Sequence, residues 1–153
     1  MSKSKILITS IAILALLFIG INPSSKIFDK EEHLIVAYYS EDCGCCEDYV
    51  EKLKMLEGVK IATILNRTEW LNIRSRYSIP DEYLGCHSML IDSKHFVEGH
   101  LQIEIVKQLL EFEKPLLLSN PDYEDSSNYY LITASEIKKC EIAEKLSECV
   151  SSG

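Results

Sequence analysis

Beyond its first few residues the chain has no cluster of lysine or arginine. Lys and Arg number 16 and Asp and Glu number 24, which gives a formal net charge of −8. A nucleic-acid surface needs concentrated positive charge to meet phosphates, so we expect no nucleic-acid partner. The cysteines also lack the spacing of a small disulfide scaffold, because the six fall as three together, one alone and two near the end. This pattern predicts a site with additional cysteines elsewhere.

The one long apolar run, Ile6 to Ile21, follows Lys3 and Lys5. A spanning helix needs about 17–25 residues and a signal core roughly 7–15, so length does not decide between them. Neither an Ala-x-Ala cleavage site nor a cysteine that could accept a lipid follows the run. Residues 1–25 are therefore either an uncleaved membrane anchor, with 6–22 in the membrane, or a signal peptide that is removed. We favour the anchor slightly. Both interpretations place the rest of the chain outside the cytoplasm, in the periplasm or on the outer cell surface.

After a polar tether at 26–33, the pattern predicts one α/β domain. Apolar residues at helical spacing follow the cysteine-rich turn at residues 43–46 and predict a helix, which Gly58 ends. The order is β-α-β-α-β-β-α, with the two adjacent strands forming a hairpin. The expected elements are a strand at 34–39, a helix at 46–58, a strand at 60–65, a helix at 68–77, strands at 88–91 and 95–100, and a helix at 101–112.

Residues 114–153 form an extension that begins with an acidic loop. We expect an edge strand at 129–132, and a capping box from Thr133 to Glu136 predicts a final helix through about residue 150. This helix would carry Cys140 and Cys149, nine residues apart. At the rise of a straight helix their Cα atoms would be about 13 Å apart, whereas a disulfide needs about 7 Å or less. Either the helix breaks between them, or they bond elsewhere.

The turn Cys43-Gly44-Cys45-Cys46 lies between the first strand and the first helix. Free N–H groups and the helix dipole stabilise negative charge at a helix N-terminus, so a cysteine there loses its proton more readily than a free thiol. Cys86-His87 precedes the third strand, and Glu98-Gly99-His100 precedes the third helix.

This order of elements, with a Cys-x-x-Cys at the first strand-to-helix turn, resembles the thioredoxin fold. The resemblance implies that Cys43 and Cys46 are a redox pair and that Cys86-His87 stands where that fold has its cis-proline loop. The three motifs together resemble, over about 34–110, the small periplasmic metal-binding proteins related to CopG that are found with copper resistance systems. That family implies a thioredoxin-like domain, here 34–113, with a central mixed sheet, flanking helices and a Cu(I) site. Tyr49 and Lys52 replace the usual Trp and His of its first helix, and its glycine- and methionine-rich segment is absent.

Thiols that converge with imidazoles make a soft-donor pocket, which suits Cu(I) first and Zn(II) second. We expect His100 to be a ligand because it ends a strand beside that of Cys86. His87 is left open, since it could point away from Cys86, and His33 and His95 are expected at the surface. Glu98 is expected to support a ligand or to face solvent. Cys43, Cys46 and Cys86 are the expected thiolate ligands, whereas Cys45 is left open, since it could bridge a second metal or point to solvent. The candidate metal ligands are therefore Cys43, Cys45, Cys46, Cys86 and His100.

Together these patterns predict an extracytoplasmic copper(I)-binding protein for copper sequestration, transfer or redox handling. A copper efflux or copper-carrying protein would be its partner. The alternative is an enzyme, a thiol–disulfide oxidoreductase in which Cys43 attacks and Cys46 resolves. A purely structural Cys43–Cys46 disulfide is the third interpretation, and sequence alone leaves open whether the chain is an enzyme.

Overall fold

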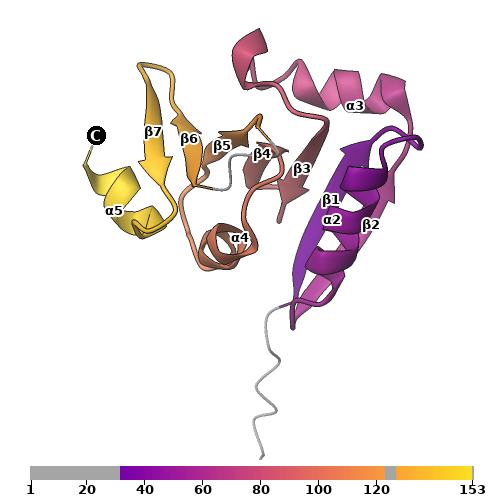
Figure 1. The fold of residues 1–153 in the computed structure, drawn as a ribbon, viewed down its shortest axis with the longest axis horizontal. Helices are drawn as coiled ribbons and strands as arrows, with labels where there is room; N and C mark the ends of the chain where they lie inside the picture. The colour runs from indigo at the N-terminus through magenta and orange to yellow at the C-terminus, as the bar shows by residue number, and fades with distance from the viewer. Residues whose placement is uncertain (1–31, 123–126, 153) are drawn as a thin grey trace, which may run out of the picture. The chain divides into compact units, whose positions relative to one another are not determined.

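A seven-stranded mixed sheet forms the centre of this computed structural model, which describes residues 32–122 and 127–152 (Figure 1). The strand order is β2-β1-β3-β4-β5-β6-β7. β1 and β2 are parallel, as are β4 and β5, and the other neighbours are antiparallel. The α/β class and the central mixed sheet are therefore confirmed. The strands are β1 (His33–Tyr39), β2 (Val59–Ile64), β3 (His87–Ile91), β4 (His95–Gly99), β5 (Leu117–Asn120), β6 (Asn128–Ile132) and β7 (Ile137–Glu141).

Four α-helices occur in the described residues, together with a short 3-10 helix, η1 (Asp81–Tyr83). The order β1-α2-β2-α3-β3-β4-α4 agrees with the sequence prediction, with η1 inserted before β3. The hairpin of β3 and β4 is also confirmed, with Ile91 opposite His95. Asn66 caps α3 by accepting hydrogen bonds from the N–H groups of Thr68 and Glu69. The helices are α2 (Gly44–Lys54), α3 (Arg67–Arg74), α4 (Ile103–Leu110) and α5 (Leu146–Ser151).

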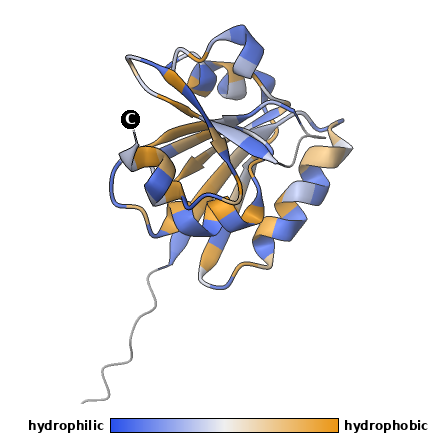
Figure 2. Cartoon of the chain, turned by 60° about the vertical axis from the view of Figure 1, so that its left-hand side comes forward, coloured by the Kyte–Doolittle hydropathy of each residue, from blue (hydrophilic) through white to orange (hydrophobic). Residues whose placement is uncertain are grey.

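The two faces of the sheet are covered by different helices. On one face, Ile35 and Ala37 of β1 belong to a buried cluster that includes residues of α2, α4 and α5. On the other face Phe96 is fully buried, and the ring of Tyr77, just after α3, stacks on it at 3.8 Å between centroids. Alternate residues of each strand therefore have different surroundings. Figure 2 shows hydrophobic residues along the central strands and mixed hydrophobic and hydrophilic residues along the helices.

The extension after residue 114 differs from the prediction. Strand β5 was not expected, and β6 lies between β5 and β7 rather than at an edge. In place of one helix over 133–150 the chain forms β7 and then the short helix α5. Thr133 closes the turn between β6 and β7, since its Oγ1 accepts from the Glu136 N–H at 3.0 Å. The same side-chain bond that caps a helix can close a turn, which explains the wrong assignment.

The break between β7 and α5 allows Cys140 and Cys149 to form a disulfide, with Cα atoms 5.9 Å apart. Both cysteines are fully buried. The sequence left two alternatives open, and the structure shows the first: the expected helix is interrupted between Cys140 and Cys149, and the two cysteines bond to each other. The expected anchor or signal at 1–25 and most of the tether lie outside the described residues, and His33, assigned to the tether, begins β1. Among the described helices, none has the length and apolar character to cross a membrane.

Candidate metal centre

The thiol-rich turn forms the beginning of α2. Cys43 is the N-cap residue, and its carbonyl accepts hydrogen bonds from the N–H groups of Cys46 and Glu47, each at 3.1 Å. This turn brings the first and fourth residues of Cys43-Gly44-Cys45-Cys46 together. Cys43 and Cys46 are joined by a disulfide, with Cα atoms 5.3 Å apart. Cys45 keeps a free thiol, 3.4 Å from the sulfur of Cys43.

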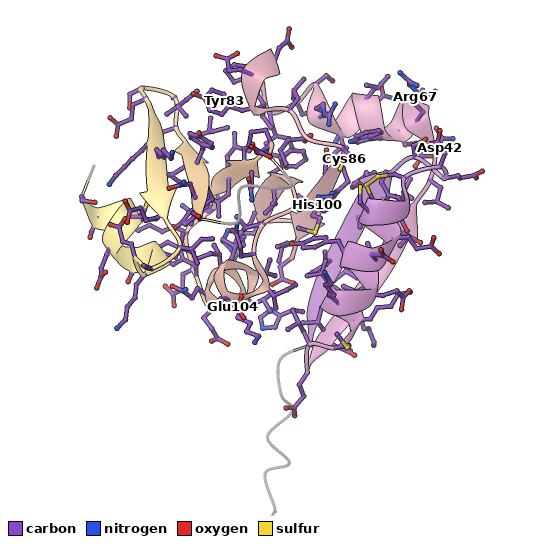
Figure 3. The ribbon with its side chains drawn as sticks, in the orientation of Figure 1. Asp42, Arg67, Tyr83, Cys86, His100 and Glu104 are labelled. Carbon is purple, nitrogen blue, oxygen red and sulfur yellow. A yellow bond between two sulfur atoms is a disulfide. The ribbon has the colours of Figure 1, made fainter. Side chains whose placement is uncertain are left out.

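Cys86 faces this turn from the loop before β3. Its sulfur lies 3.4 Å from that of Cys46 and 4.0 Å from that of Cys45. Figure 3 shows Cys86 and His100 near the N-terminal end of α2. The four sulfur atoms of Cys43, Cys45, Cys46 and Cys86 all lie within 4.8 Å of one another. The structure therefore brings together the four cysteines that the sequence selected, including Cys45.

Two imidazoles complete the cluster. His100 follows β4, and both of its ring nitrogens lie 3.8 Å from the sulfur of Cys86. His87, the first residue of β3, is fully buried, and its ring centroid lies 4.5 Å from that of His100. Tyr49 of α2 contacts both rings, at centroid distances of 5.1 Å and 5.0 Å. Cys46, Cys86, His87 and His100 form a second group of donors within 4.8 Å, which shares Cys46 and Cys86 with the first.

His87 is the residue that sequence reasoning left open. It lies opposite Tyr39 of β1, so its side chain points to the face of the sheet that α2 covers, whereas Ser88 points to the other face. Neither ring nitrogen of His87 has a hydrogen-bond partner among the residues that the structure describes. Buried polar groups are normally paired, so an imidazole in this state next to thiols is suited to bind a metal. The position of His87 next to Cys86 was visible in the sequence. The direction of the His87 side chain was not, because it depends on the register of β3 with β1.

Two glycines allow the loop that carries Cys86 to approach the end of β4. A Cβ atom on Gly85 would lie 2.5 Å from the Cα of Gly99. Gly99 itself has φ of +77°, and a Cβ there would lie 2.0 Å from the backbone oxygen of Asn120. Only glycine fits such contacts without a shift of backbone. Since Cys86 follows Gly85 and His100 follows Gly99, this contact brings the two ligand candidates together.

Burial sets the protonation of the cluster. It lowers the pKa of His87 to about 3, with His100 and Arg74 adding to the effect. Burial and the nearby Lys52 lower the pKa of His100 to about 4, although a hydrogen bond to the Cys45 backbone opposes this. Both imidazoles are therefore neutral near pH 7 and have a lone pair for a metal. Burial, followed by the neighbouring Cys45 thiol, raises the pKa of Cys86 to about 11, so metal binding there must displace a proton.

Three residues outside the cluster were assigned from the sequence. His95 was expected at the surface but is fully buried, with Nε2 3.0 Å from the Phe112 carbonyl and Nδ1 accepting from the Leu116 N–H. His33 was also expected at the surface, but it is half-buried and pairs with Asp92 at 2.8 Å. Glu98 is fully buried and bonded to the N–H of Gly85, beside Cys86. It therefore supports the cysteine loop rather than facing solvent.

No protein-family model matches the chain, and no curated protein matches it. Two solved structures do, both of a copper resistance protein, copG. The chain is structurally similar to copG. Form 1 of copG has a TM-score of 0.57 and 24% identity, covering 71% of this chain and 95% of copG. Form 2 has a TM-score of 0.57 and 25% identity, covering 72% of this chain and 98% of copG. Nearly all of copG therefore has a counterpart here, in a chain whose clustered cysteines and histidines are able to bind a metal ion.

Proposed function

We propose that this chain binds copper(I) through its cysteine and histidine cluster, for copper sequestration, transfer or redox handling. The observation that carries the proposal is the convergence of four sulfurs and two buried imidazoles in two donor groups, each within 4.8 Å. Thiolate and imidazole donors favour Cu(I), with Zn(II) as the second choice. The similarity to copG, a copper resistance protein by name, supports copper.

The roles of single residues follow from the same geometry. We assign Cys43, Cys45, Cys46 and Cys86 as thiolate ligands and His100 as a nitrogen ligand. We add His87 because its buried ring nitrogens have no hydrogen-bond partner in residues 32–122 and 127–152. The Cys43–Cys46 disulfide must take up two electrons before these two sulfurs can act as thiolates. The thioredoxin-like assignment of the core is part of the proposal, supported by the element order and by the position of the pair at the start of α2.

The proposal includes a location outside the cytoplasm, in the periplasm or on the outer cell surface. It rests on the basic start and the apolar run of residues 1–25, a signal peptide or membrane anchor in the sequence interpretation. There the protein would receive or deliver its ion through a copper efflux or copper-carrying partner.

A thiol–disulfide oxidoreductase is the second candidate, favoured by the disulfide at the N-terminus of α2. After reduction, the Cys43 thiolate would attack a client disulfide and release one client thiolate. Cys46 would then attack the mixed disulfide, which releases the second client thiolate and restores the Cys43–Cys46 bond. The free Cys86 thiol, 3.4 Å from Cys46, offers a competing disulfide, so we rank this candidate second.

The deciding experiment is a Cu(I) titration of the full-length protein, reduced and kept anaerobic, against a chromogenic chelator. We expect uptake of Cu(I) in competition with the chelator. Cys86→Ser should abolish tight binding, because Cys86 belongs to both donor groups. Unfolding by denaturant should show that the variant keeps its fold.

The matched control replaces two cysteines outside the cluster, Cys140→Ser with Cys149→Ser, and should bind Cu(I) as the wild type does. Failure of the wild type to take up Cu(I), combined with reduction of a disulfide substrate such as insulin, would replace the copper proposal with the oxidoreductase. Equal Cu(I) stoichiometry in wild type and Cys86→Ser would remove Cys86 from the site.

A further inference from the structure

A buried ion pair lies on the sheet face opposite the metal cluster. Glu98 of β4 is fully buried and pairs with Arg74 of α3, whose guanidinium nitrogen Nη2 donates to Oε1. Nε of Arg74 also donates to Oε2 at 3.3 Å. Ser88, across from Glu98 in β3, donates to Oε2 at 2.6 Å. The pair is thus bonded on both carboxylate oxygens and fixed to two strands and one helix.

The same pair binds the backbone of Gly85, the residue before Cys86. The Gly85 N–H donates to Oε1 of Glu98 at 2.9 Å, and the Gly85 carbonyl accepts from Nη2 of Arg74 at 2.7 Å. That carbonyl belongs to the peptide bond with Cys86, so its orientation sets the position of the Cys86 backbone. We call these two hydrogen bonds the Gly85 clamp.

Trp70 holds the arginine in place. Its ring lies under the guanidinium, with Cζ of Arg74 4.5 Å from the ring centroid, and its Nε1–H donates to Oγ of Ser88 at 2.8 Å. Ser88 in turn donates to Glu98. The contacts close a ring from Trp70 through Ser88, Glu98 and Arg74, which leaves the guanidinium little freedom to leave Gly85.

Stability alone is a weak reason for this arrangement. Removing two charges from water is costly, and an apolar pair of similar volume often gives equal or greater stability than a buried ion pair. Unlike apolar residues, a bidentate arginine donates several hydrogen bonds in fixed directions. In this structure one of those hydrogen bonds holds the loop that carries Cys86.

We propose that Arg74 and Glu98 are positioning residues for the metal ligand Cys86, acting through the Gly85 clamp from the opposite face of the sheet. This inference rests on the proposed metal-binding function. The clamp holds the Cys86 sulfur 3.4 Å from Cys46 and 3.8 Å from the His100 nitrogens. Without the Gly85 clamp, the loop that carries Cys86 would no longer be held at its position relative to α2.

The test compares Glu98→Gln and Arg74→Lys with the wild-type protein in the full-length chain. Glutamine keeps the shape of the side chain but loses the charge that holds Arg74, and lysine keeps the charge but loses the fork that also reaches Gly85. We expect Cu(I) affinity to fall about 10- to 100-fold in Glu98→Gln, as is typical when a partner of a metal ligand is changed. Arg74→Lys should give an intermediate loss.

A spectroscopic measurement separates positioning from a loss of stability. Cd(II) bound by thiolates gives a charge-transfer absorption whose intensity increases with the number of sulfur ligands. We expect this absorption to weaken in both variants, because Cys86 is no longer held at the metal. The control is Asp92→Asn, which breaks the His33–Asp92 pair at the other end of the β3–β4 hairpin and should leave affinity and absorption unchanged.

A third measurement needs no metal. In the reduced, metal-free protein the alkylation rate of Cys86 relative to Cys45 should rise in both variants, because the freed loop exposes its thiol.

Variants that are less stable but keep wild-type Cu(I) affinity, Cd(II) absorption and alkylation ratio would overturn the inference and leave the pair a structural role. Failure of the wild type to bind Cu(I) would instead overturn the proposed function, and the alkylation ratio would still report on the clamp. If Glu98→Gln does not fold, Arg74→Lys decides by the same three measurements.

Discussion

At the residue scale, two buried histidines differ in their hydrogen bonding, and this difference indicates which of them is available to bind a metal. His87 and His95 are both fully buried. The ring of His95 is bonded at both nitrogens to backbone groups, whereas neither nitrogen of His87 has a partner within the described part of the chain. A buried polar group without a partner costs about 1–3 kcal/mol. His87 therefore lowers the stability of the metal-free fold, a cost that a bound metal would remove.

We predict that His87→Phe raises the free energy of unfolding of the metal-free protein by about 1 kcal/mol while weakening Cu(I) binding. The aromatic ring keeps most of the packing against Tyr49 and His100 and removes the unpaired nitrogens. Denaturant unfolding and competitive Cu(I) titration measure the two effects. Effects of opposite sign on stability and affinity would be hard to explain by general damage to the fold.

The control is His95→Phe, which breaks two hydrogen bonds to backbone and should lower stability while leaving Cu(I) affinity unchanged. A His87→Phe protein that is less stable than wild type, or that binds Cu(I) equally well, would contradict a ligand role for His87.

The cysteine cluster at the start of α2 was predictable residue by residue, because three thiols in four residues at a helix N-terminus form a local pattern. The facing residue Cys86 was found through the resemblance in the order of motifs. Glu98 and Arg74 were harder to place. A glutamate in a strand and an arginine in a helix are ordinary surface residues in sequence, and their joint role at Gly85 depends on the packing of α3 on the sheet.

At the scale of elements, the first seven were predictable, as was β6, which matches the strand expected at 129–132, but the rest of the extension was not. The first strands and helices have long apolar runs or clear helical spacing, which are reliable signals. β7 has the sequence Ile137-Lys-Lys-Cys-Glu141, which has no apolar alternation, and only Cys140 is buried in it. Its strand form comes from pairing with β6, a non-local contact that a local pattern does not contain.

The disulfide between β7 and α5 gives a prediction for this extension. Cross-linking residues nine apart restricts the unfolded chain, and in the loop-entropy picture such a closure contributes about 2–3 kcal/mol. Cys140→Ala with Cys149→Ala should lower the free energy of unfolding by about this amount, measured by denaturant unfolding under oxidising conditions. Cu(I) affinity should not change, since neither cysteine belongs to the cluster.

The comparison is the reduced, metal-free wild type with the reduced, metal-free double variant. Reduction opens Cys43–Cys46 in both proteins and Cys140–Cys149 in the wild type, so their free energies of unfolding should then agree. If the double variant lost Cu(I) binding together with stability, the extension would have to contribute to the site, and its treatment as a separate stabilising element would be wrong.

At the scale of the whole molecule, the two disulfides have different chemical surroundings. Both free cysteines, Cys45 and Cys86, lie beside the Cys43–Cys46 bond. Cys140 and Cys149 are fully buried, whereas Cys43 is partly exposed. Thiol–disulfide exchange requires access to a sulfur atom, so a reductant should reach the Cys43–Cys46 bond first. The redox state of the Cys43–Cys46 bond would then set how many thiolates the cluster offers to a metal, while the Cys140–Cys149 bond stabilises the extension.

We predict that stepwise reduction of the full-length protein opens Cys43–Cys46 before Cys140–Cys149, and that Cu(I) uptake rises with the first step. The oxidised protein keeps only Cys45, Cys86 and the two imidazoles as donors, whereas the reduced protein has all four thiolates. Differential alkylation with mass spectrometry identifies the bond that opens, and copper content is measured on the same samples. Uptake that is complete before Cys43 and Cys46 are reduced would exclude both from the ligand set. Uptake that follows only the opening of Cys140–Cys149 would move the site to the extension, away from the cluster at α2.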